Sequence, residues 1–110
     1  MRPMPRDLMI HSATLALCAP DAYGAVTLTP VAELTRVRVE TTETLRDDGQ
    51  ALRPGLSAVL WYDARHSGPR GVGFAPGQML LFEGRRYRVE TVEARYGGRR
   101  LHHVELGLSG

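Results

Sequence analysis

The chain has 110 residues, of which 43% are hydrophobic and 24% charged, so it is long enough for one domain with its own core but not for two. Its net charge of +2 is too small to argue for nucleic-acid binding, and its single cysteine excludes an internal disulfide. No apolar run approaches the roughly 20 residues of a membrane span, and the first residues do not form a signal peptide, so we expect a cytosolic protein.

Six segments are predicted to be β-strands separated by turns that contain glycine or proline. In chain order they cover residues 8–17, 32–41, 56–64, 78–82, 86–94 and 100–108. Residues 26–28 extend the first hairpin until Pro30 ends it, because proline cannot donate to a strand ladder. Residues 32–41 alternate strictly between apolar and charged side chains, as in a half-buried strand. Residues 56–64 are more continuously apolar and are expected at the centre of the sheet.

Two long connections interrupt these strands. Residues 42–55 are polar, contain the turn signal Asp47-Asp48-Gly49 and include a weak helix candidate at 43–52, while residues 65–77 are rich in glycine and proline. Six short antiparallel strands around a small core tend to close, because closure removes exposed edges. We therefore expect an all-β protein with a single domain over residues 1–110. It would be a small antiparallel, meander-like β-barrel or a tight sandwich, with two long loops and a flexible N-terminal arm at 1–7.

The residue types of a catalytic triad occur together only once. Asp63, His66 and Ser67 lie within five residues, whereas triad members normally converge from separate elements. We interpret them as the polar entry to a loop. His11 and Cys18 lie on one predicted strand, roughly 23 Å apart at about 3.3 Å per residue. The sequence therefore predicts no catalytic residues and no enzyme activity.

Metal and cofactor sites are not expected either. His102 and His103 are adjacent on a predicted strand, so their side chains point to opposite faces and cannot both bind one ion without a distortion of the strand. His102 lies on the face of Val104 and Leu106 and is predicted to be a buried structural histidine, whereas His103 faces outward or toward a neighbour. Residues 71–77 are rich in glycine, but no helix follows them and Pro76 lacks an amide donor, so they do not match a phosphate-binding loop.

Arginine supplies every positive side-chain charge apart from histidine, and six arginines fall within residues 85–100. Glu83, Glu90 and Glu93 are interleaved with them. Mixed charges on strand faces favour ion pairs across strands or between subunits, and an ordinary solvated face remains an equal alternative. A nucleic-acid groove on a small barrel is the less favoured interpretation, because few exposed aromatic residues are available for base stacking.

Short motifs in a fixed order link this chain to a known family. They are the opening Met4–His11, the strand Arg36-Val37-Arg38-Val39-Glu40, the segment Leu60–Asp63 followed by Ser67 and Pro69, the hairpin Phe82–Tyr87, and the closing Leu101-His102-His103-Val104-Glu105-Leu106. In these motifs the chain resembles the small minor capsid proteins of tailed bacteriophages and prophages, which are encoded among the head-to-tail joining genes. It departs from them in lacking lysine, in its fuller glycine-rich loop and in having Val104 where an aromatic residue is common.

The resemblance implies a structural role as a head completion, or stopper-like, head-tail connector. Such a protein would form a six- or twelve-fold ring at the virion neck, beneath the portal and adaptor, after assembling in the host bacterial cytoplasm. The ring would close the DNA channel and dock the tail. Its partners would be copies of itself, the portal or adaptor, the tail terminator, and packaged DNA near loop 65–77. A small nucleic-acid-binding β-barrel is the alternative function.

Within this reading, two sets of residues are candidates for contacts. Arg65 and Arg70 are the candidates for facing DNA in the channel. The candidates for subunit contacts are Arg36, Arg38, Glu40, Arg86, Arg88, Glu90 and His103.

Overall fold

The computed structural model describes residues 9–20, 22–41 and 55–110. The expected N-terminal arm, the turn signal at 47–49 and the helix candidate at 43–52 lie outside these residues. The described strands are β1 (His11–Pro20), β2 (Val26–Thr41), β3 (Ala58–Asp63), β4 (Met79–Phe82), β5 (Arg85–Gly97) and β6 (Arg100–Ser109). The described residues contain no helix that is long and apolar enough to cross a membrane.

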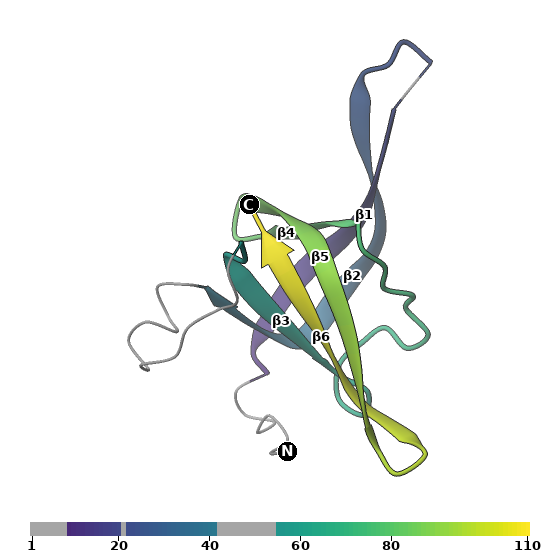
Figure 1. Ribbon diagram of the computed structural model, residues 1–110, viewed down its shortest axis with the longest axis vertical. Helices are drawn as coiled ribbons and strands as arrows, with labels where there is room; N and C mark the ends of the chain where they lie inside the picture. The colour runs from purple at the N-terminus through teal and green to yellow at the C-terminus, as the bar shows by residue number, and fades with distance from the viewer. Residues whose placement is uncertain (1–8, 21, 42–54) are drawn as a thin grey trace.

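The strands form a closed antiparallel barrel in the order β1-β2-β3-β6-β5-β4 (Figure 1). Two three-stranded meanders, β1-β2-β3 and β4-β5-β6, are joined along both of their outer edges. The seam between β3 and β6 runs from Ala58↔Leu108 to Asp63↔His103, whereas the seam between β1 and β4 is limited to Thr14–Ala16. The prediction of a small β-barrel is confirmed, and the meander holds within each half.

The core draws buried apolar side chains from all six strands, with leucine the most frequent. Its largest fully buried side chains are Leu15, Leu34, Leu60, Leu80, Leu106, Leu108, Val37 and Val89. Each such side chain contributes about 1.5–3 kcal/mol relative to the exposed state. The glycine-rich loop adds Val72 and Phe74, which pack against this core, and Phe74 meets the ring of Tyr62 edge-on at 5.2 Å. The loop therefore covers part of the barrel interior.

The strict alternation predicted for residues 32–41 is wrong. Leu34 and Val37 are both buried although they are three residues apart. Between them the backbone of Arg36 has a positive φ of 52°, and the register with β1 shifts between His11 and Ala13. A β-bulge inserts an extra residue here, so the apolar side chains before and after the bulge both face the core.

Pro30 does not end the first hairpin, contrary to expectation. It lies within β2, paired with Ala16 at a second register shift. The partner on the other side, β3, pairs only with Arg38–Thr41 of β2, so the missing N–H of Pro30 interrupts no ladder there. The β1–β2 hairpin consequently continues beyond the barrel as a two-stranded ribbon, seen projecting upward in Figure 1. We call residues 17–20 and 22–31 the β1–β2 ribbon.

A second hairpin extends in another direction. Strands β5 and β6 pair out to Gly97↔Arg100, and Gly98 turns the chain with a φ of 67°. Tyr96 and Leu101, which face each other near this turn, are 63% and 39% exposed. The glycine-containing turn expected between the strands at 86–94 and 100–108 is confirmed, although β5 continues to Gly97. The barrel therefore carries one extension at each of two opposite ends (Figure 1).

Candidate functional site

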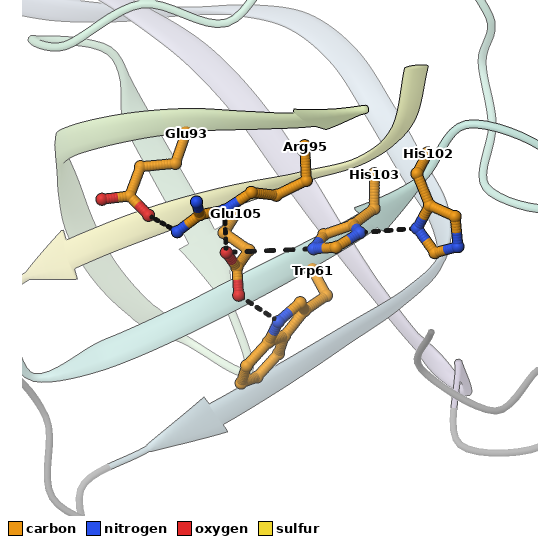
Figure 2. A network of polar contacts seen from close by, with 6 residues as sticks. All are labelled: Trp61, Glu93, Arg95, His102, His103 and Glu105. Carbon is orange, nitrogen blue, oxygen red and sulfur yellow. Dashed lines mark hydrogen bonds and ion pairs between the residues drawn. The ribbon is translucent and has the colours of Figure 1, made fainter. Parts of the chain in front are cut away.

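The outer face of β3, β6 and β5 carries a connected set of polar side chains around the only tryptophan (Figure 2). Strand pairing places Trp61 opposite Glu105, and Glu105 opposite Glu93. The indole Nε1 of Trp61 donates to Glu105 Oε1 at 2.8 Å. Glu105 thereby links the tryptophan to the charged groups of the neighbouring strand.

Arg95 lies between two carboxylates. Its Nε donates to Glu105 Oε2 at 3.1 Å and its terminal nitrogen donates to Glu93 Oε2 at 2.7 Å. The hydrogen bond that Arg95 donates to Glu105, followed by the charge of Glu93, raises the pKa of Arg95. The guanidinium therefore stays charged and its charge is neutralised within the network.

The two adjacent histidines belong to the same network. The Nδ1 atoms of His102 and His103 are 2.7 Å apart, and Nε2 of His103 is 3.8 Å from Glu105 Oε2. Burial lowers the pKa of His103, and the charge of Glu105 opposes this effect. Between two neutral rings, one Nδ1 must donate and the other accept. A proton on Nε2 of His103 would face Glu105, so we assign His102 as the donor and His103 as the acceptor.

The prediction for the histidine pair is wrong in two respects. His103 is the buried one, at 7% exposed, whereas His102 is half-buried. The rings do not diverge but meet edge-on, with centroids 5.0 Å apart. The cause is a register shift in the pairing with β5, where Arg95↔His103 is followed by Tyr96↔Leu101 and His102 is left without a partner residue. As a candidate for subunit contacts, His103 therefore has almost no exposed surface on this chain.

The triad-like residues Asp63, His66 and Ser67 build a turn. Asp63 Oδ1 accepts from the amides of Arg65 and His66 at 2.8 and 2.9 Å. Ser67 Oγ accepts from the Asp63 amide and donates to the carbonyl oxygen of Arg36. Both the aspartate and the serine thus fix the backbone after β3, and the interpretation of this segment as a loop entry is confirmed.

His11 and Cys18 are also separate from each other. His11 Nδ1 accepts from the Val39 amide at 3.0 Å, and its ring meets Phe82 edge-on. Burial, and then the charge of Arg38, lower the pKa of His11. Cys18 is exposed on the β1–β2 ribbon. In the part of the chain that the structure describes, no three histidine, cysteine or carboxylate side chains are arranged to hold a metal ion.

The other subunit-contact candidates differ in how much surface they offer. Arg38 and Glu40 pair with each other at 3.4 Å and their side chains are only 18% and 13% exposed. Arg88 and Glu90 form a looser pair at 3.6 Å with 63% and 41% of their side chains exposed. Arg36 and Arg86 are exposed. The structure therefore leaves Arg36, Arg86, Arg88 and Glu90 accessible to a neighbour.

The two candidates for contact with DNA, Arg65 and Arg70, are both exposed. Both follow β3: Arg65 belongs to the turn fixed by Asp63, and Arg70 follows Pro69, whose carbonyl oxygen accepts a hydrogen bond from the Tyr62 hydroxyl. Burial raises the pKa of Tyr62, and the charge of Arg70 acts against this. The loop backbone is thus anchored while both guanidinium groups face solvent.

A small pocket lies at the end of the barrel near the β4–β5 turn. Its volume is about 190 Å³ and its lining is Thr41, Phe82, Glu83, Arg85 and Tyr87. Ligand sites for drug-sized molecules are usually about 300–1,000 Å³. Among the described residues that line this pocket, the charged groups are the carboxylate of Glu83 and the guanidinium of Arg85.

Sequence reasoning missed the outward-facing tryptophan network and the apolar surface of the ribbon. The position of Trp61 between the core residues Leu60 and Tyr62 was the available signal, since neighbouring residues in a strand face opposite sides. On the ribbon, Leu17 and Val31 are 49% and 53% exposed, and Tyr23 is 96% exposed. No protein-family model matches the chain, and a search of the curated proteins finds no match.

Proposed function

We propose that this chain is a structural head-tail joining protein of a tailed bacteriophage or prophage, of the head completion or stopper type. Its copies assemble into a six- or twelve-fold ring at the virion neck, beneath the portal and adaptor. The ring closes the DNA channel and offers a docking surface to the tail. The motif resemblance suggests this role, and the β1–β2 ribbon is the structural observation that carries it.

The ribbon supports the proposal because it is poorly explained by the fold of a single chain. It extends past the last pairing of β1 with β4, Ala16↔Met79, so only two strands hold it together. Isolated two-stranded ribbons are marginally stable in water. It nevertheless exposes Leu17, Val31 and Tyr23. A ribbon of this kind gains stability when its apolar side chains and strand edges are covered by another subunit.

A closed ring requires heterologous contacts, in which one surface of each subunit meets a different surface of the next. A projecting ribbon on one side of a compact barrel provides two such unlike surfaces. The exposed pair Arg88–Glu90 and the exposed Arg86 offer further polar contacts on the barrel itself.

Deletion of the gene from the phage or prophage that carries it tests the proposal. We expect capsids that lose their DNA and that are not joined to tails, as seen by electron microscopy of the particles. Supplying the gene in trans should restore joined virions. Normal virions from the deletion would refute the function.

A free-standing small nucleic-acid-binding β-barrel is the second candidate, and the exposed arginines of the loop after β3 favour it. The same deletion separates the two functions. A nucleic-acid-binding protein that works outside the particle leaves virion assembly intact when it is removed, whereas a neck protein does not.

A further inference from the structure

Five arginines from three separate segments lie at one end of the barrel. We call this set the arginine end, and it consists of Arg36, Arg65, Arg70, Arg99 and Arg100. All five are exposed. The first lies in the β2 bulge, the next two in the loop after β3, and the last two at the tip of the β5–β6 hairpin, Arg99 in its turn and Arg100 at the start of β6.

Backbone hydrogen bonds bring these segments together. Thr35 and Gly68 exchange hydrogen bonds in both directions, at 2.9 and 3.1 Å, so the bulge that carries Arg36 lies against the loop that carries Arg65 and Arg70. The Ala64 amide donates to the His102 carbonyl oxygen at 3.1 Å, which ties the start of the same loop to the base of the β5–β6 hairpin. Figure 1 shows the start of this loop and the hairpin at the same lower end of the barrel.

The charge at this end is not neutralised within the described residues. None of the five arginines forms an ion pair with a described carboxylate. Three carboxylates of the adjoining strands are already engaged, since Asp63 is buried and caps the turn, and Glu93 and Glu105 bind Arg95. At the opposite end, by contrast, Arg88 pairs with Glu90, and Glu83 lines the same pocket as Arg85. Among the described residues, unpaired positive charge is therefore concentrated at the arginine end.

We propose that the arginine end binds the phosphate backbone of double-stranded DNA. Guanidinium groups bind phosphate oxygens through two parallel hydrogen bonds, and arginine remains charged at any physiological pH. A two-stranded β-ribbon such as the β5–β6 hairpin is narrow enough to enter the major groove. A duplex presents phosphates at regular intervals, which suits charges distributed over three segments. That this end faces the channel of a neck ring rests on the proposed function, whereas the affinity for DNA does not.

Two other polyanionic partners fit the surface less well. Single-stranded nucleic acid is usually held by several aromatic side chains that stack on its bases, and Tyr96 is the only strongly exposed aromatic residue described at this end. A membrane surface is usually bound by a broad apolar face next to the basic residues. Here only Tyr96 and the partly exposed Leu101 accompany the arginines.

Fluorescence anisotropy of the full chain with a short labelled duplex of mixed sequence tests the proposal. Two triple variants remove the same amount of charge from opposite ends. Arg65→Gln/Arg70→Gln/Arg99→Gln alters the arginine end, and Arg85→Gln/Arg86→Gln/Arg88→Gln is the matched control. Arg36 is left unchanged because its positive φ constrains the backbone. All six substituted arginines are exposed, so both variants should unfold at the wild-type temperature.

The salt dependence gives the number of phosphate contacts. If all five arginines contact phosphates, log K should fall with log salt with a slope of about −4.5 between about 50 and 200 mM, since each contact contributes about −0.9. The arginine-end variant should reduce the steepness by about 2.7 and weaken binding at least about tenfold at the low-salt limit. The control variant should change the affinity less than about threefold.

Three results would overturn the inference: equal losses in the two variants, no measurable binding of the wild type to the duplex at low salt, or tighter binding to phosphatidylglycerol vesicles or single-stranded DNA than to the duplex. These failures are distinguishable from failure of the proposed function. Normal virions after gene deletion would remove the neck role and leave the measured DNA affinity standing. Loss of the DNA affinity would leave the outcome of the deletion unchanged.

Discussion

The Nδ1 atoms of His102 and His103 point at each other across 2.7 Å, although the two residues are neighbours in one strand (Figure 2). This contact tolerates one shared proton but not two, because two imidazolium rings would each direct an N–H at the other. The buried member of the pair, His103, faces Asp63 of β3, Arg95 of β5, and Glu105 and His102 of its own strand. His103 is thus a buried titratable group whose charged neighbours come from β3, β5 and β6.

The first expectation concerns stability against acid. Burial lowers the pKa of His103 and of His11 below 6.5, so the unfolded chain binds more protons than the folded one as the pH falls from that value. The contribution of these two histidines to stability is fully present above about pH 6.5. It is lost progressively as the pH falls from that value through the lower pKa values of the folded state. Thermal unfolding measured from about pH 7.5 to pH 5.5 should show a falling midpoint.

The His103→Gln variant isolates the contribution of this residue. It removes the titration and keeps a polar side chain that is able to accept from His102. The fall in the unfolding midpoint between the two pH values should be smaller than in the wild type, with the remainder due to His11. His66→Gln serves as the control, because His66 is half-buried in the turn after β3 and binds Asp63 through its backbone amide. An equal pH dependence in the His103 variant and the wild type would contradict this account.

The second expectation concerns the tryptophan network. Trp61→Phe keeps an aromatic ring on the outer face but removes the donor to Glu105. Loss of a hydrogen bond to a charged acceptor typically costs about 1.5–3 kcal/mol, and less when the acceptor is accessible to water. Since Glu105 is 26% exposed and keeps Arg95 as a partner, we expect a loss of about 1 kcal/mol in the free energy of unfolding by urea.

Glu105→Gln is the matched variant for this measurement. Its side-chain oxygen still accepts from Trp61, but the charge that binds Arg95 is gone. The tryptophan emission comes from a single residue in this chain. In the folded Glu105→Gln variant its wavelength should therefore stay close to that of the wild type, although the free energy of unfolding falls. If Trp61→Phe proves as stable as the wild type, the indole donor has no role in joining β3 to β6.

Periodicity predicted the strands well because each has its own local signal. Alternating side chains and glycine turns gave the segments 78–82, 86–94 and 100–108 almost as the structure has them. Local patterns do not report where two strands fall out of register. The bulges at Arg36 and at His102 are set by the register with the neighbouring strand, β1 for the first and β5 for the second, and each reversed or shifted the face assigned to a residue.

The same limit applies to the candidate site. Arg65 and Arg70 could be selected from the sequence because they share one loop. Arg36 and Arg99 could not be grouped with them, since the contact between Thr35 and Gly68 and the link between Ala64 and His102 depend on barrel closure. A count of charges along the chain therefore missed a cluster that the closed barrel creates.

The third expectation uses Gly107, which is buried in β6. A Cβ at this position would lie 2.3 Å from Thr91 Oγ1 and 2.9 Å from a methyl carbon of Leu56. Gly107→Ala should therefore destabilise the fold by about 1–3 kcal/mol, as overpacking usually does. Thr91→Ala removes the closer of the two atoms, so the double variant should recover part of the loss. Purely additive effects in this double-mutant cycle would mean that the two positions do not touch.

The last expectation separates folding from assembly through the β1–β2 ribbon. Leu17→Ser/Val31→Ser replaces two side chains that are 49% and 53% exposed, so the stability of the single chain should change by less than about 0.5 kcal/mol, as is usual at the surface. If the ribbon contacts a neighbouring subunit, particles made with this variant should lose tail attachment, counted by electron microscopy. Ile10→Ser is the control, because Ile10 is 68% exposed but lies outside the ribbon, and it should leave attachment intact. If heads of the double variant are joined to tails as often as wild-type heads, the ribbon is not the assembly contact, because assembly would then not depend on its apolar side chains.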